Sequence, residues 1–160
     1  MAGLVLVAYA TKRGSTREVA EAIAATLREQ GFDVSVEPAG KVRKDIERFD
    51  GVMIGGALYS GRWHHHALRL LKRLRKLPAT KPVAVFGMGP RRTAEIAFER
   101  ASKQLHRALA KVPEVEPVAV GVFGGADAKK GVDIRDWDAI RVWAEEVGEA
   151  IGSVGAPPAV

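Results

Sequence analysis

The sequence predicts an α/β domain in which a parallel sheet is covered by helices on both faces. Five short apolar runs, each typical of a buried strand, are separated for the most part by segments with helical spacing. Parallel strands need long crossover connections and are buried on both faces, so they appear as continuous apolar runs. The connections fit a doubly wound five-stranded sheet of order 2-1-3-4-5. The runs are Leu4–Ala8, Val34–Val36, Val52–Ile54, Val83–Phe86 and Val118–Val122.

Four segments between or after these runs place apolar residues three and four positions apart, as one buried face of a helix requires. In the second of them, Arg69, Lys72, Arg73 and Lys76 are expected to turn outward. The connection from Pro38 to Phe49 differs, because it has room only for a short or irregular helix. The four apolar faces are Val19, Ile23 and Leu27; Leu70, Leu74 and Leu77; Ala94, Phe98, Ala101 and Leu105; and Trp137, Ile140, Ala144, Val147 and Ile151.

The chain of 160 residues fits one domain with a substantial core. We expect this domain to span residues 1–152 and a flexible tail, rich in Gly and Pro, to span 153–160. No segment approaches the length of a membrane span and no signal-peptide pattern opens the chain, so the expected location is cytoplasmic. The chain has no cysteine, which excludes disulfides, thiolate metal sites and thiol nucleophiles.

The net charge of +6 is unevenly spread along the chain. From Gly51 to Ala94 there are nine basic residues and no Asp or Glu. A one-sided positive field favours anionic partners such as acidic proteins, carboxylated small molecules or an anionic membrane surface, although a solvated basic face has the same composition. The basic segment lacks interleaved aromatic residues and a recognition motif, which argues against nucleic acid.

The turn between the first strand and the first helix carries the main functional signal. Such a turn directs free backbone N–H groups and the positive end of the helix dipole at one point, where a phosphate monoester can bind. Hydroxyl groups would add donors, and Gly14 would let the backbone come close to the ligand. A turn with a Ser/Thr cap is the alternative. The P-loop and dinucleotide fingerprints are absent, because Gly14 is not followed by Lys and is the only glycine here. The residues of the turn are Thr11, Lys12, Arg13, Gly14, Ser15 and Thr16.

Further loops are expected beside this turn, because ligands of doubly wound sheets bind beyond the carboxyl ends of the strands. They are residues 55–64, 87–90 and 123–127. Glycine recurs at these strand ends, which we interpret as room for a flat ligand. Tyr59 and Trp63 would supply aromatic faces there, unless they only pack over the loop.

Together these segments resemble the flavodoxin superfamily. The Thr11–Thr16 turn matches the family's Thr/Ser-x-x-Gly-x-Thr phosphate loop, and residues 52–64, 122–126 and 135–137 resemble flavodoxin-domain proteins related to menaquinone-dependent protoporphyrinogen IX dehydrogenase. The resemblance implies one non-covalent FMN, with its phosphate on Thr11 to Thr16. The residues that it implies around the isoalloxazine ring are Ala57, Leu58, Tyr59, Gly61, Trp63, Gly89, Pro90, Phe123, Gly124 and Gly125.

Three functions remain open at this point. The first is an FMN-dependent oxidoreductase that acts on a porphyrinogen-like small molecule or is linked to a quinone. The second is an electron-transfer protein that docks an acidic protein partner through the face from Arg69 to Lys76, and the third is a flavin-free adaptor. Dehydrogenases of this kind carry a longer insertion than Gly124–Asp133, and electron-carrier flavodoxins are usually acidic, whereas this chain is basic.

Several side chains near these loops are candidates for chemistry. Three arginines, Arg62, Arg91 and Arg92, could pair with carboxylates of a substrate, and the alternative is that they are solvated residues of the loops. Lys12 and Arg13 are expected to offer backbone donors. The run His64–His66 contains three possible metal ligands. Consecutive residues at a helix start are expected to point apart, however, so we predict no metal site. His64 remains a candidate proton donor.

Overall fold

The computed structural model describes residues 3–11, 14–43, 45–78, 80–90 and 94–153. Its central sheet has the order β2-β1-β3-β5-β6, and neighbouring strands on this path run parallel. This confirms the predicted doubly wound sheet of order 2-1-3-4-5. The strands are β1 (Leu4–Ala10), β2 (Asp33–Pro38), β3 (Gly51–Tyr59), β5 (Val83–Met88) and β6 (Ala119–Phe123).

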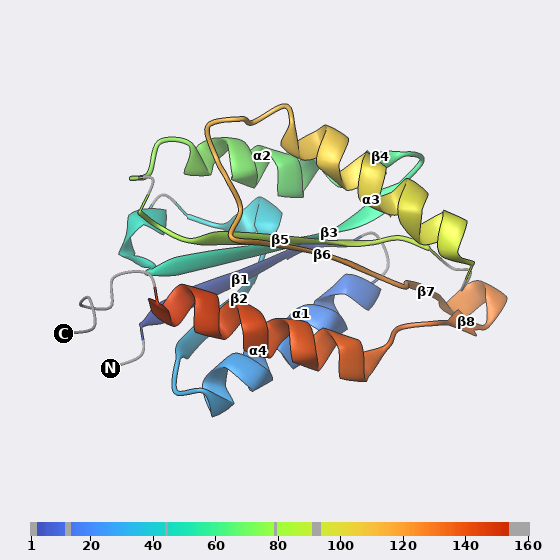
Figure 1. The fold of residues 1–160 in the computed structure, drawn as a ribbon, viewed down its shortest axis with the longest axis horizontal. Coiled ribbons are helices and arrows are strands. Elements are labelled where there is room, and N and C mark those ends of the chain that lie inside the picture. Colours follow the sequence, from blue (N-terminus) through green and yellow to red (C-terminus); the bar gives the residue numbers. More distant parts are fainter. Residues whose placement is uncertain (1–2, 12–13, 44, 79, 91–93, 154–160) are drawn as a thin grey trace.

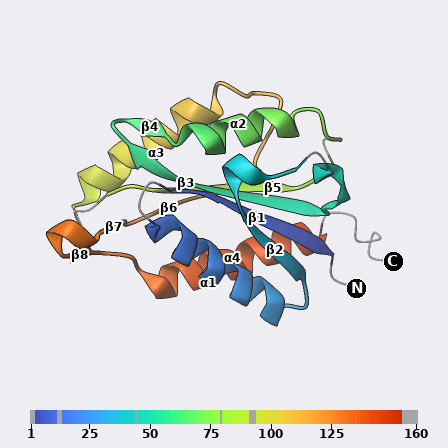
Figure 2. The ribbon, with the colours of Figure 1, turned by 180° about the vertical axis from the view of Figure 1, so that it is seen from behind.

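Four helices cover the sheet, two on each face (Figures 1 and 2). α1 (Ser15–Glu29) and α4 (Trp137–Ser153) pack on one face, and α2 (His65–Leu74) and α3 (Glu95–Leu109) on the other. Each pair closes its own apolar cluster against the sheet, one around Ile23, Leu27 and Ile140, the other around Leu70 and Leu105. The helical spacing in the sequence therefore identified the buried faces.

Two residues of the predicted apolar faces lie at helix starts and are exposed. Ala94 precedes α3, and Trp137 opens α4 with 42% of its surface exposed. The Arg135 guanidinium lies over the Trp137 ring, 4.8 Å from its centroid. A first-turn position can share the face of a helix and still extend past the edge of the sheet, so the spacing alone overestimated burial there.

In the connection between β2 and β3, the described residues (39–43 and 45–50) form two short 3₁₀ turns and no helix of greater length, as predicted. These turns are η1 (Ala39–Lys41) and η2 (Ile46–Arg48). The irregular backbone of this connection leaves carbonyl groups that need donors from outside. Arg73 supplies them, since its guanidinium donates to the carbonyls of Val42 at 2.9 Å and Arg43 at 2.7 Å. The expectation that Arg73 turns outward is therefore wrong.

Two short hairpins were not foreseen, because two-residue strands carry no periodicity. β4 (Arg62–Trp63) pairs antiparallel with the end of β3 through a turn in which Ser60 and Gly61 both have positive φ. Positive φ at both central residues is the backbone of a tight hairpin turn. β7 (Ala126–Asp127) and β8 (Val132–Asp133) form the second hairpin, around the 3₁₀ turn η3 (Ala128–Lys130).

The last helix continues to Ser153, one residue past the expected domain end, and the remaining tail lies outside the described residues. Within the described ranges, none of the helices combines the length and the apolarity that crossing a membrane requires.

Candidate functional site

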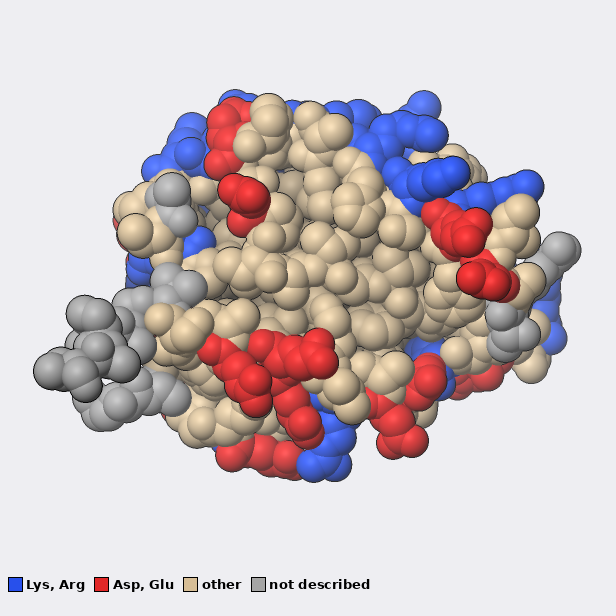
Figure 3. Space-filling model, in the orientation of Figure 1, with Lys and Arg blue, Asp and Glu red and all other residues tan. Residues whose placement is uncertain are grey.

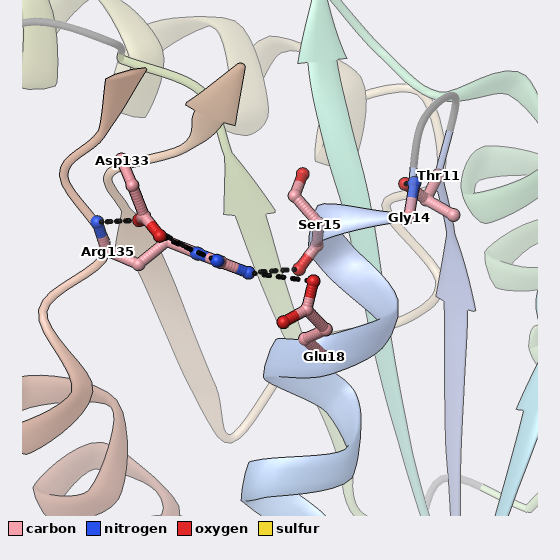
Figure 4. A network of polar contacts seen from close by, with 6 residues as sticks. All are labelled: Thr11, Gly14, Ser15, Glu18, Asp133 and Arg135. Atoms are coloured by element: carbon pink, nitrogen blue, oxygen red, sulfur yellow. Dashed lines mark hydrogen bonds and ion pairs between the residues drawn. The ribbon is translucent and has the colours of Figure 1, made fainter. Parts of the chain in front are cut away.

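The turn after β1 prepares the start of α1 for a ligand. Gly14 is the N-cap of α1, with φ of 94°, and its N–H donates to Thr11 Oγ1 at 2.8 Å (Figure 4). Among the described residues no side chain caps the helix, and the first amides of any helix lack partners within it. The amides at Ser15 and Thr16 therefore meet the requirement for binding an anion. Lys12 and Arg13 lie outside the described residues.

Thr16 adds a second, independent signal. Its side chain is fully buried, and Oγ1 has no hydrogen-bond partner among the described residues. A buried hydroxyl without a partner costs on the order of 1–3 kcal/mol, so such groups are rare unless a ligand completes them. An unpartnered donor beside free helix amides is the chemistry that a phosphate ester requires.

The glycines of the site have a different role from the one predicted. A Cβ at Gly14 would meet nothing within 4 Å among the described residues, and the left-handed φ of 94° by itself favours glycine here; the expected close approach to a ligand stays a prediction. Most glycines within the strands or at their ends make room for a protein side chain, so packing within the protein explains them, and the interpretation as room for a flat ligand is corrected at these positions. The pairs are Gly55 with Phe86, Gly56 with Trp63, Gly87 and Gly89 with Leu58, Gly121 with Trp143, and Gly124 with Ile134.

The loops after β5 and β6 meet, as predicted. The Gly89 N–H donates to the Phe123 carbonyl at 3.1 Å, and the Gly125 N–H donates to the Pro90 carbonyl at 2.8 Å. These bonds join the two loops at the carboxyl edge of the sheet. Five of the predicted ring contacts, Gly89, Pro90 and the run Phe123–Gly125, therefore lie in one unit linked by backbone hydrogen bonds. Arg91 and Arg92, in the same stretch, lie outside the described residues.

An open cavity of about 630 Å³ lies beside the β3–β4 hairpin. Tyr59 is half exposed there, which suits a ring that contacts a ligand. Trp63 is buried, and its indole Nε1 donates to the Phe86 carbonyl at 3.2 Å, so most of this side chain packs in the core. Residues lining the cavity are Ala57, Tyr59, Ser60, Arg62, Trp63, His64 and His65.

His64 has a structural role at the edge of this cavity. It is the N-cap of α2, and its Nδ1 accepts from the His66 N–H at 3.1 Å. Burial, followed by the charges of His65 and His66, lowers the pKa of His64 below its ordinary value of 6.5. The cap needs an unprotonated Nδ1, so bond and pKa both favour the neutral imidazole. This argues against His64 as a proton donor near neutral pH.

The three consecutive histidines lie closer together than expected. Their ring centroids are 4.2 to 5.0 Å apart, and their ligand nitrogens lie within 4.8 Å of one another. The argument that they point apart is wrong, because His64 precedes the helix with φ of −50° and ψ of 133° and its ring stacks on that of His65. The neighbouring basic residues still oppose a divalent cation.

Arg135 connects the second hairpin to the start of α1 (Figure 4). Its side chain is only 9% exposed, and it donates to the Asp133 carboxylate at 2.9 and 2.7 Å. It also contacts the Ser15 carbonyl at 3.4 Å and the Glu18 carboxylate at 3.5 Å. The hydrogen bonds from Arg135 lower the pKa of Asp133 to about 2. Sequence reasoning did not place Arg135 in the site, since its partner Ser15 is distant along the chain.

The chain matches a known protein family over most of its length. The family described as "Flavodoxin domain" matches residues 6–148. The chain belongs to the flavodoxin family. No curated protein matches it at a significant level.

Solved flavodoxins share the fold at low sequence identity. A flavodoxin from Streptococcus pneumoniae TIGR4 is 20% identical, with a TM-score of 0.65, over 94% of this chain and 98% of that one. A short-chain flavodoxin associated with a non-canonical PDU bacterial microcompartment is 19% identical, with a TM-score of 0.69, over 94% and 99%. A mutant flavodoxin from Fusobacterium nucleatum, bound to flavin mononucleotide, is 17% identical, with a TM-score of 0.60, over 95% and 96%.

Proposed function

We propose that this flavodoxin-family chain binds one FMN without a covalent bond and exchanges electrons with a redox partner. The observation that carries the proposal is Thr16 at the start of α1, whose buried Oγ1 lacks a partner in the part of the chain that the structure describes. It ends the Thr-x-x-Gly-x-Thr sequence of the turn. The Fusobacterium nucleatum flavodoxin of the same fold is bound to FMN, which supports the same cofactor here.

In this proposal the two ends of FMN meet different parts of the site. The turn from Thr11 to Thr16 binds the phosphate through backbone amides and hydroxyls, and Arg135 holds that turn in place. Tyr59 and the joined loops at Gly89–Pro90 and Phe123–Gly125 border the ring. FMN supplies the redox chemistry when bound, and the chain contributes position and electric field.

A test separates the phosphate from the ring. Thr16→Val keeps the shape of the side chain and removes the hydroxyl. A hydrogen bond to a charged group contributes about 1.5–3 kcal/mol, so FMN affinity should fall roughly 10- to 100-fold. Riboflavin, which lacks the phosphate, should bind as before. Both affinities can be measured by titration calorimetry of the flavin-free protein.

Thr26→Val is the matched control. Thr26 is also a buried threonine of α1, but its Oγ1 donates to the Ala22 carbonyl at 3.3 Å, so its hydroxyl already has a partner. This variant should retain FMN affinity. Equal loss of FMN and riboflavin in Thr16→Val, or a protein that binds no FMN at all, would refute the proposed phosphate site.

A second candidate rests on the cavity beside Tyr59. A volume of about 630 Å³ is within the range of small-molecule sites, and Arg62 offers a guanidinium to a substrate carboxylate. An FMN-dependent oxidoreductase that acts on a porphyrinogen-like or quinone-like molecule fits these features. Turnover of protoporphyrinogen IX by the FMN-loaded protein with a quinone acceptor, with KM raised in Arg62→Gln, supports it. If the flavin-loaded protein shows no turnover, electron transfer remains as the proposed function.

A further inference from the structure

A groove of about 430 Å³ adjoins the cavity and lies between the β3–β4 hairpin, α2 and α3. We call it the hairpin groove. Its polar lining residues are Ser60, Arg62, His65, Gln104, Arg107 and Lys111. Arg62 comes from β4, whereas Gln104, Arg107 and Lys111 recur every three or four residues along α3 and the turn after it. The fold thus gathers like charges that are far apart in the sequence.

The cations of the groove lack acidic partners. Arg62, Arg107 and Lys111 are exposed, none forms an ion pair within the described part of the chain, and no carboxylate lines the groove. On the opposite face the arrangement is different, since Arg141 pairs with Glu29 and Glu145. Like charges that converge without partners repel one another, and a bound anion relieves this repulsion.

The positive field extends well beyond the groove. Exposed Arg69, Lys72 and Lys76 continue it over α2, and the first turn of α2 has no acidic residue. Figure 3 shows Lys and Arg gathered along the upper edge over α2 and α3, and Asp and Glu mostly along the lower side over α4. Two cations suffice for a small anion, whereas a field spread over two helices complements the surface of a macromolecule.

We propose that the hairpin groove is the docking site of a protein redox partner, which inserts a cluster of Asp and Glu side chains between β4 and α3. This inference rests on the proposed electron-transfer function and identifies the surface that serves it. The groove shares Ser60, Arg62 and His65 with the cavity beside Tyr59. A partner docked in the groove therefore lies against the hairpin that borders the proposed flavin site, so the path for electrons is short.

A labelled oligoglutamate peptide serves as the probe, and its binding to the full chain is followed by fluorescence anisotropy. Binding should be strongest at low salt and weaken steeply as ionic strength rises. The groove variant Arg107→Gln/Lys111→Gln should weaken peptide binding about tenfold, within the range that electrostatic steering reaches. The comparison variant Arg69→Gln/Lys72→Gln removes the same charge from the outer face of α2, where it contributes only to the wider field, and should weaken binding clearly less, about two- to threefold.

A second measurement ties docking to electron transfer. The flavin-loaded protein is reduced, and its oxidation by ferricyanide, a trivalent anion, is timed with and without oligoglutamate. The peptide should slow the wild type and have little effect on the groove variant. Oxidation by hexaammineruthenium, a cation, should not be slowed in either protein.

The outcomes separate the two proposals. Peptide binding that persists in protein without bound flavin, with no FMN uptake, overturns the proposed function and keeps the groove as an acidic docking site. The groove is refuted as the docking site if the protein takes up FMN and both variants lose peptide binding equally. It is also refuted if the loss is confined to Arg69→Gln/Lys72→Gln. The choice of a protein partner would also be refuted if anionic lipid vesicles or a DNA oligonucleotide bound the groove more strongly than the oligoglutamate peptide does.

Discussion

Gly14 and Thr16 lie two residues apart in the turn, and the structure gives each a separate task. Gly14 provides a left-handed backbone that leads from β1 into α1, and Thr16 provides a buried hydroxyl that finds no partner within the described ranges. The sequence motif contains both residues but does not distinguish backbone geometry from ligand contact. Substitutions at the two positions should therefore have different consequences.

Gly14→Ala should lower the free energy of unfolding by about 1–2 kcal/mol, because a Cβ is unfavourable at positive φ. It should also weaken FMN binding, since strain in the turn moves the amides that face the phosphate. Chemical denaturation and FMN titration provide the two measurements.

Gly131→Ala is the matched control for this substitution. Gly131 also has positive φ, at 65°, and a Cβ there would likewise meet nothing within 4 Å. It lies in the turn between β7 and β8, so it should show a similar loss of stability with unchanged FMN affinity. Equal effects of the two variants on FMN would show that Gly14 acts through stability alone.

At the scale of elements, two arginines connect α1 to the region around α4. Arg135 contacts Ser15 and Glu18 at the phosphate end of α1, and Arg141 contacts Glu29 at the other end. Arg135→Gln should weaken FMN binding roughly three- to tenfold, the equivalent of one hydrogen bond of about 1 kcal/mol, and leave riboflavin binding unchanged. Isothermal titration with both flavins measures this difference.

Arg141→Gln removes a comparable bridge without touching the turn. It should leave the affinity for both flavins as in the wild type. A parallel drop in FMN and riboflavin affinity for Arg135→Gln would mean that the residue stabilises the domain in general rather than positioning the turn.

The start of α2 should make stability depend on pH. The pKa of His64 is lowered in the folded protein, so the unfolded chain binds protons more readily, and stability rises with pH. As pH falls through the ordinary value of 6.5 towards the folded value, this contribution is lost, and protonation of Nδ1 also removes the cap. Denaturation curves between pH 5 and 8, compared for the wild type and His64→Asn, measure the effect.

His64→Asn keeps a capping acceptor and removes the titration, so its stability should vary less over this range. His106→Gln is the control, since His106 is an exposed histidine of α3 whose ring contacts Ser102 of the same helix rather than the start of α2. Should His64→Asn retain the full pH dependence, His64 is not its source.

At the scale of the whole molecule, Lys and Arg gather along the edge over α2 and α3 (Figure 3). A cation about 8 Å from the flavin ring, at an effective dielectric of 20, stabilises an added electron by about 2 kcal/mol before screening. Arg62→Gln, at the cavity, should therefore lower the reduction potential of bound FMN. Arg75→Gln, exposed at the far end of α2, should not. Spectroscopic redox titration compares the three proteins, and equal potentials would show that the basic layer does not tune the flavin.

The sheet order is not visible in the sequence and comes from the doubly wound pattern that the connections fit. The sequence by itself determined the class of the fold and predicted a turn for phosphate. These depend on local properties, namely apolar runs, helical spacing and a short motif, and each holds before the chain is folded. The family match over residues 6–148 agrees with them.

Only the tertiary structure decided which side chain each residue meets. In the folded chain Arg73 donates to carbonyls of a distant loop, and Arg135 contacts Ser15. Protein side chains occupy the space beside several glycines of the sheet, and the three rings of His64–His66 lie close together. The fold also gathers Arg62 and Lys111 in one groove. Such pairings depend on how elements pack across long sequence separations, and composition or spacing carries no information about them.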